Sequence, residues 1–157
     1  MQRAAASIPA AAIRVASLDA ALAAAEAACR LDCPLPLACP PLANGAGPGW
    51  FWALGRSLDQ RFPDLSLDLI FDAGGEPGTA LAALRRGFRR VVFAGNPTAA
   101  GRLADIASQA EAEILPRLAP VLDLSVEDAR KPARNREGNR AFERSSEWLS
   151  TLHARRV

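Results

Sequence analysis

Residues 65–96 read LSLDLIFDAGGEPGTALAALRRGFRRVVFAGN, and they decide the fold of this chain. The apolar run Leu65–Phe71 predicts a strand, the glycine-rich segment Asp72–Gly78 predicts a turn, and Thr79–Arg86 predicts a helix. Arg90–Phe93 predicts a second strand, because it contains a short, continuous apolar run. The stretch is therefore a strand–helix–strand unit with an acid and three glycines after its first strand.

The same alternation of strand and helix extends along the chain as far as Pro116. Strands are expected to begin near residues 13, 35, 66, 90 and 112, at intervals of 22, 31, 24 and 22 residues. Intervals of this size leave room for one helix between successive strands, which makes the strands parallel. We therefore predict an α/β fold of three layers, with an open, parallel, five-stranded sheet between its helices.

The expected second strand, Cys33–Pro41, contains two prolines that bear on the strand order. Pro34 and Pro36 lie two residues apart, so both missing N–H groups face the same side of the strand. Such a side fits the edge of a sheet, where no neighbour needs the donors. An edge position for this strand predicts the flavodoxin-like order 2-1-3-4-5. The alternative is a partial (β/α) barrel that closes only on dimerisation.

Composition divides the chain into three regions. Residues 1–126 form the predicted α/β domain, in which Leu118–Val126 is an apolar segment with no assigned element. Residues 127–140 are rich in charge and predict a solvated linker. Residues 141–157 contain an expected helix, Ala141–Ala154, which is either docked on the domain or bound to a partner chain.

Length, charge and cysteine spacing set broad limits on the function. A chain of 157 residues fits one domain. No apolar run reaches the roughly 18 residues of a membrane span, and the start is a poor signal peptide, so we expect a cytoplasmic protein without membrane association. The net charge of +2 and the arginine-rich residues 130–140, which lack interleaved aromatics, give no support for nucleic-acid binding. Cys29, Cys33 and Cys39 match no zinc or redox spacing and predict buried free thiols.

A binding site is expected where the strand order reverses, at the carboxyl ends of the first and third strands. Glycines there let the backbone approach a ligand, and the start of the following helix favours an anion. The sequence therefore predicts a small anionic, phosphate-bearing ligand. A cation or a hydroxyl-rich ligand would use the two aspartates instead, and an ordinary turn with a capped helix also fits. The expected site residues are Ser17, Asp19, Asp72, Gly74, Gly75, Gly78, Thr79 and Asn96.

Evidence for catalysis is sparse, although Asp72 is the best candidate for a catalytic acid, base or metal ligand. The chain has no HExxH or GxSxG motif, no complete GxGxxG fingerprint and no Walker A loop, so it names no cofactor and no metal centre. The sole histidine, His153, lies near the end of the chain. A third hypothesis is a homo-oligomer or regulatory complex formed through the C-terminal helix.

The pattern of Asp72, Pro77, a helix and an apolar strand resembles the centre of a phosphoacceptor receiver domain, over about a fifth of the chain. Membership would imply a phosphorylated aspartate and a metal site. The resemblance stops there, because no acidic pair follows the first strand, Gly95 replaces the hydroxyl residue and Arg117 stands near the lysine position. We therefore assign the chain to no family.

Overall fold

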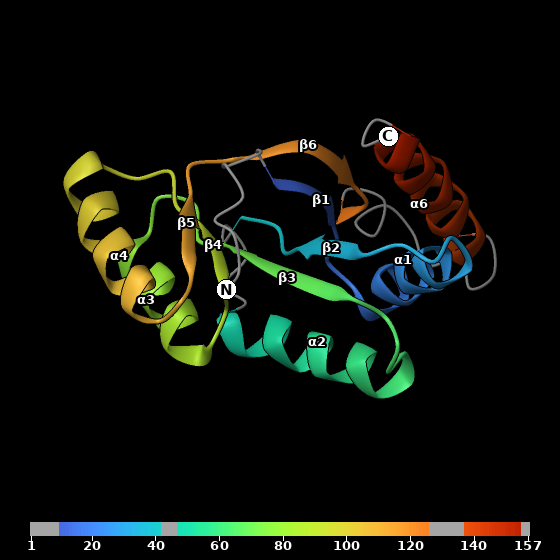
Figure 1. Cartoon of the computed structure of the whole chain (residues 1–157), viewed down its shortest axis with the longest axis horizontal. Helices are drawn as coiled ribbons and strands as arrows, with labels where there is room; N and C mark the ends of the chain where they lie inside the picture. Colours follow the sequence, from blue (N-terminus) through green and yellow to red (C-terminus); the bar gives the residue numbers. More distant parts are fainter. Residues whose placement is uncertain (1–9, 42–46, 126–136, 155–157) are drawn as a thin grey trace.

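The computed structural model of this chain describes residues 10–41, 47–125 and 137–154, in which six strands alternate with five helices (Figure 1). The strands are β1 (Ala10–Arg14), β2 (Leu35–Ala38), β3 (Leu67–Asp72), β4 (Arg90–Val92), β5 (Glu113–Leu115) and β6 (Leu118–Asp123). The helices are α1 (Leu18–Arg30), α2 (Pro48–Arg61), α3 (Pro77–Arg86), α4 (Pro97–Gln109) and α6 (Glu137–Ala154). The predicted α/β class is confirmed, and β6 is a strand that the sequence pattern did not reveal.

All the strands pair in parallel, in the order β5-β4-β3-β2-β1-β6. Strand β2 lies between β1 and β3, so the predicted edge position and the flavodoxin-like order are wrong. The N–H of Leu35 donates to the carbonyl of Ser66 on the β3 side, so Pro36 faces β1. The pairing of β2 with β1 begins only at Leu37, beyond both prolines. By the same register Pro36 lies opposite Ala12 of β1, so the ladder between β1 and β2 is confined to the residues after the prolines, where donors are present.

The sheet is curled into a half-barrel, because β5 and β6 occupy its opposite edges and yet are joined directly. Only Pro116 and Arg117 lie between them, and three Cα–Cα steps span at most about 11 Å. A flat sheet would separate these edges by five strand spacings, or about 24 Å. The partial (β/α) barrel is therefore the better of the two predicted architectures.

The two faces of the curled sheet bury different kinds of side chain. One face packs against the helices and contributes Ile13, Leu37, Phe71 and Val91 to a single large core. The helices surround this outer face (Figure 1), so the expected layers of helices on both faces are not observed. The inner face carries a second, smaller cluster with one buried residue from each of five strands, namely Ala12, Ala38, Ile70, Val92 and Leu115.

The C-terminal helix α6 packs along α1 of the same chain (Figure 1). It buries Ala141, Ser145 and Leu149, which recur at every fourth residue and face the alanine-rich side of α1. The guanidinium of Arg30 lies 4.6 Å from the ring centre of Phe142. The helix begins at Glu137, inside the predicted linker, whose residues 127–136 lie outside the described part of the chain. No helix among the described residues is both long enough and apolar enough to cross a membrane.

Candidate functional site

Arg14, the last residue of β1, forms an ion pair with Asp72, the last residue of β3. The Nη2 group of Arg14 donates to Oδ2 of Asp72 at 3.0 Å. Both residues follow the inner-face parity of their strands, and the contact is diagonal, because Arg14 is level with Ala38 of β2 and Ile70 of β3, two residues before Asp72. The pair therefore spans the inner face at the carboxyl end of the sheet, which is where (β/α) barrels place their active sites.

A second carboxylate reaches Arg14 from the opposite side. Asp123 ends β6, the other neighbour of β1, and its Oδ2 lies 3.5 Å from Nη1 of Arg14. The two aspartates sit in similar turns: Oδ1 of Asp72 accepts from the N–H of Gly74, and Oδ1 of Asp123 accepts from the N–H of Ser125. The hydroxyl of Ser125 also donates to Oδ1 of Asp123. One guanidinium thus joins the ends of three strands.

The guanidinium of Arg14 is largely buried but has few hydrogen-bond partners. Its side chain is 18% exposed, and only one of its N–H groups donates a hydrogen bond within the described residues. The Nε atom is buried and has no hydrogen-bond partner in the part of the chain that the structure describes. A buried donor without an acceptor destabilises the fold, so an added acceptor at Arg14 would be favourable.

Cys39, the first residue after β2, holds the backbone of Asp72 in place through its thiol. The N–H of Asp72 donates to Sγ of Cys39 at 3.2 Å, and the thiol donates to the carbonyl of Asp72 at 3.9 Å. Burial raises the pKa of the Cys39 thiol to about 12, so it stays protonated at neutral pH. Cys39 and Cys33 are buried free thiols as predicted, whereas Cys29 is exposed, which corrects that part of the prediction.

Several predicted site residues serve as helix caps in the structure. The hydroxyl of Ser17 accepts from the N–H of Ala20 and caps α1, and Oδ1 of Asn96 accepts from the N–H of Ala99 and caps α4. Asp19 lies exposed in the first turn of α1. These groups flank the carboxyl end of the sheet but do not join the Arg14 ion pairs.

The remaining predicted residues line the turn between β3 and α3. Gly74 has a positive φ of 55°, and its carbonyl accepts from the N–H of Ala94. The exposed Gly75 faces the backbone of Gly95 in the next turn, where a β-carbon would lie 3.9 Å from the Cα of Gly95. Unlike α1 and α4, helix α3 begins without a side-chain cap, because its N-cap residue Glu76 makes no such hydrogen bond. Gly78 and Thr79 follow in its first turn.

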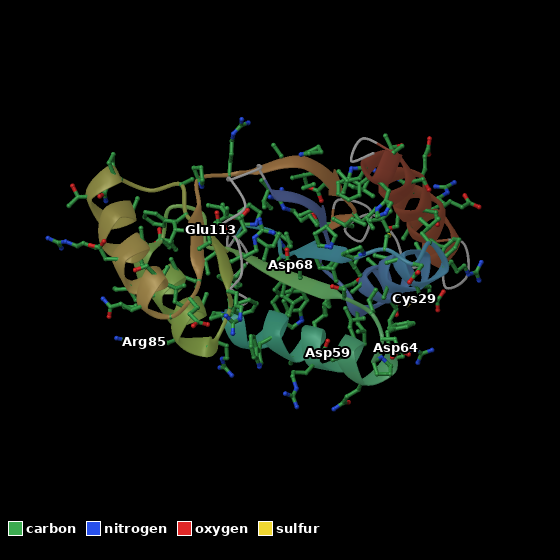
Figure 2. The ribbon with its side chains drawn as sticks, viewed as in Figure 1. Cys29, Asp59, Asp64, Asp68, Arg85 and Glu113 are labelled. Carbon is green, nitrogen blue, oxygen red and sulfur yellow. The ribbon has the colours of Figure 1, made fainter. Side chains whose placement is uncertain are left out.

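A second charged cluster lies at the amino end of β3, β4 and β5. Arg90 of β4 contacts Asp68 of β3 at 2.6 Å and Glu113 of β5 at 3.7 Å. Figure 2 labels the two acids, Asp68 on β3 and Glu113 on β5. The inner face therefore has charge at both ends and apolar residues between them. Charge at the amino end of a barrel is typically structural, because it joins neighbouring strands away from the ligand side.

The sequence alone did not point to Arg14 and Asp123. Arg14 is a charged residue in an otherwise apolar strand, which was a usable signal. Asp123 could not be placed, because Leu118–Val126 had no assigned element. Among the described residues, no group of three or more His, Cys, Asp or Glu side chains is arranged to hold a metal ion.

Comparison with known proteins adds nothing to this geometry. No family model matches the sequence, and a search of curated proteins finds no relative.

Proposed function

We propose that this chain is a small-molecule-binding domain built on a (β/α) half-barrel, with its site at the carboxyl end of the sheet. The ligand we propose is small, anionic and phosphate-bearing. It lies over the end of β1, between the β3–α3 turn and Asp123 at the end of β6. The ion pair of Arg14 and Asp72 carries the proposal, since it holds a largely buried guanidinium at the end of β3, five residues before the uncapped start of α3 at Pro77.

Two features favour an anion at this position. The partial positive charge at the start of a helix attracts anions, and the N-terminal N–H groups of α3 have no side-chain acceptor. The neighbouring acid, Asp72, is paired with Arg14, which offsets its repulsion of an anion. The exposed Glu76 remains as an unfavourable charge. Replacing it in Glu76→Gln should therefore tighten binding.

The proposal is tested by measuring thermal protection with inorganic phosphate, pyrophosphate and a panel of phosphorylated metabolites. Gly75→Val should abolish protection without unfolding the chain, because Gly75 is exposed and a β-carbon added there meets only the Cα of Gly95, at 3.9 Å. Gly101→Val is the matched control, since Gly101 lies exposed on α4 with no atom within 4 Å of its added β-carbon. Equal protection of both variants would remove this turn from the site.

A second candidate function is catalysis by Asp72. It is favoured by the presence of an ionisable partner, Arg14, at hydrogen-bond distance from Asp72. Arg14 would orient the carboxylate as an acid or base. Phosphate release from a panel of phosphomonoesters should then be lost in Asp72→Asn. Equal rates in the two proteins, or no release by either, would leave binding as the better assignment.

We also infer a cytoplasmic location, supported by the three free thiols. A homo-oligomer formed through α6 is our third proposal, although this helix already uses one face within its own chain. Light scattering of the full chain tests it directly, and a monomeric mass at high concentration would exclude it.

A further inference from the structure

Arg14 makes two unequal contacts with its carboxylate partners. The contact with Asp72 is a hydrogen bond of 3.0 Å to a side chain that is 7% exposed. The contact with Asp123 is 3.5 Å long, makes no hydrogen bond, and involves a side chain that is 36% exposed. Charge-assisted hydrogen bonds are typically about 2.7–2.9 Å long, so the second contact is loose. Asp72 is thus the fixed partner of Arg14, and Asp123 is the exchangeable one.

Asp123 has hydrogen-bond donors other than Arg14. Its Oδ1 accepts hydrogen bonds from both the N–H and the hydroxyl of Ser125. Its exposure allows water to solvate the other oxygen. If Arg14 turned to another anion, Asp123 would keep its own turn and gain water.

Arg14 has donors to offer an oxyanion. Its Nη1 group forms no hydrogen bond within the described residues, and its Nε atom is buried without a partner. A guanidinium presents its N–H groups as a planar fork that matches the oxygens of a phosphate. The partial exposure of the side chain leaves a route for a ligand from the side of Asp123.

We propose that Arg14 anchors the phosphate group of the ligand and that Asp123 is an internal competitor, which the phosphate displaces from Nη1 of Arg14. This inference rests on the proposed phosphate-binding function. It names Arg14 as the residue that binds the phosphate and Asp123 as the residue that weakens that binding.

The test is a set of binding isotherms for inorganic phosphate, measured by titration calorimetry on the full chain. Asp123→Asn should bind phosphate roughly tenfold more tightly, because the competing charge is gone while the amide can still accept from Ser125. Glu76→Gln is the matched control, because it removes the same charge from an exposed residue that forms no ion pair with Arg14.

A double-mutant cycle separates competition at Arg14 from a general effect of charge. In an Arg14→Gln background the gain from Asp123→Asn should disappear, whereas the gain from Glu76→Gln should persist. Circular dichroism checks that each variant is folded. If Arg14→Gln does not fold, Arg14→Lys takes its place, because it keeps the charge beside Asp72 but loses the fork.

The measured phosphate affinities distinguish the competitor role of Asp123 from the alternatives. The inference is overturned if Asp123→Asn still tightens phosphate binding in the Arg14→Gln background. It is also overturned if Asp123→Asn binds phosphate with the same affinity as the wild type. In that last case the proposed function survives. Absence of binding in the wild type and in Asp123→Asn overturns both proposals together. Binding by Asp123→Asn alone supports the competitor role.

Discussion

Arg14 and Asp72 form a hydrogen-bonded ion pair although their strands are not neighbours. Strand β2 separates β1 from β3, so two strand spacings, or about 9.6 Å, lie between the backbones. The contact at 3.0 Å is also diagonal, because Arg14 is level with Ile70 and Asp72 lies two residues further along β3. The long side chain of Arg14 therefore reaches past the small, buried Ala38 of β2 to the end of β3.

Removing the charge of Asp72 should destabilise the fold. Asp72→Asn keeps an acceptor for the N–H of Gly74 but leaves the half-buried Arg14 without its fixed counter-charge. We expect the free energy of unfolding to fall by about 1–3 kcal/mol. Urea denaturation measures this change. Glu111→Gln breaks the exposed pair with Arg89 and should leave stability unchanged. Similar losses in the two variants would show that burial of the Arg14 pair is not important.

The sequence predicted the parallel α/β class because strand and helix patterns alternate at regular intervals. The predicted order is wrong because Pro34 and Pro36 do not require an edge position for β2, which pairs with both β1 and β3. The missing N–H groups of Pro34 and Pro36 do face one side, but β1 pairs with β2 only beyond them. Local geometry was predictable, whereas the point at which a neighbouring strand begins to pair was not.

In the candidate site, too, residues in a local motif were predictable and residues brought together by distant strands were not. Asp72 and the glycines after β3 were predicted from a local motif, and they do lie at the carboxyl end of the sheet. Arg14 and Asp123 were missed because their roles depend on strands that meet only in the folded chain. The direct connection from β5 to β6 places Asp123 beside β1. The spacing of apolar residues in the sequence does not predict that the chain passes from one edge of the sheet to the other at this point.

The close packing of α2 on β3 should make Gly55 intolerant of a side chain. A β-carbon at Gly55 would lie 2.1 Å from Cδ1 of Leu69. Alanine favours a helix over glycine by about 1 kcal/mol, but overpacking costs about 1–3 kcal/mol, so Gly55→Ala should lower the melting temperature. Gly101→Ala, where the added carbon meets nothing within 4 Å, should raise it. An increase in both variants would mean that Leu69 moves aside without cost.

The interface between α6 and α1 contains a polar group that weakens it. Ser145 is fully buried, and its hydroxyl has no hydrogen-bond partner among the residues that the structure describes. Ser145→Ala should raise the free energy of unfolding by about 1 kcal/mol, since it removes an unsatisfied group from an apolar contact. Ser150→Ala on the exposed side of the same helix is the control. A loss of stability in Ser145→Ala would show that the hydroxyl has a partner in solution.

Cys39 should make the stability of the fold fall at alkaline pH. The pKa of its buried thiol is about 12, against an ordinary value of 9.0. Between these values the unfolded chain loses the proton while the native chain keeps it, so stability decreases as pH rises. The slope for one such group is at most about 1.4 kcal/mol per pH unit.

Urea denaturation between about pH 8 and pH 10.5 measures this slope, which should flatten in Cys39→Ala. The chain contains no tyrosine, but burial also raises the pKa of the Cys33 thiol, so a smaller slope of the same sign should remain in Cys39→Ala. The exposed Cys29 provides the control, because Cys29→Ala should leave the slope unchanged. A thiol reagent should correspondingly modify Cys29 in the native protein and reach Cys39 only after unfolding. Rapid modification of Cys39 in the native state would contradict the burial that raises its pKa.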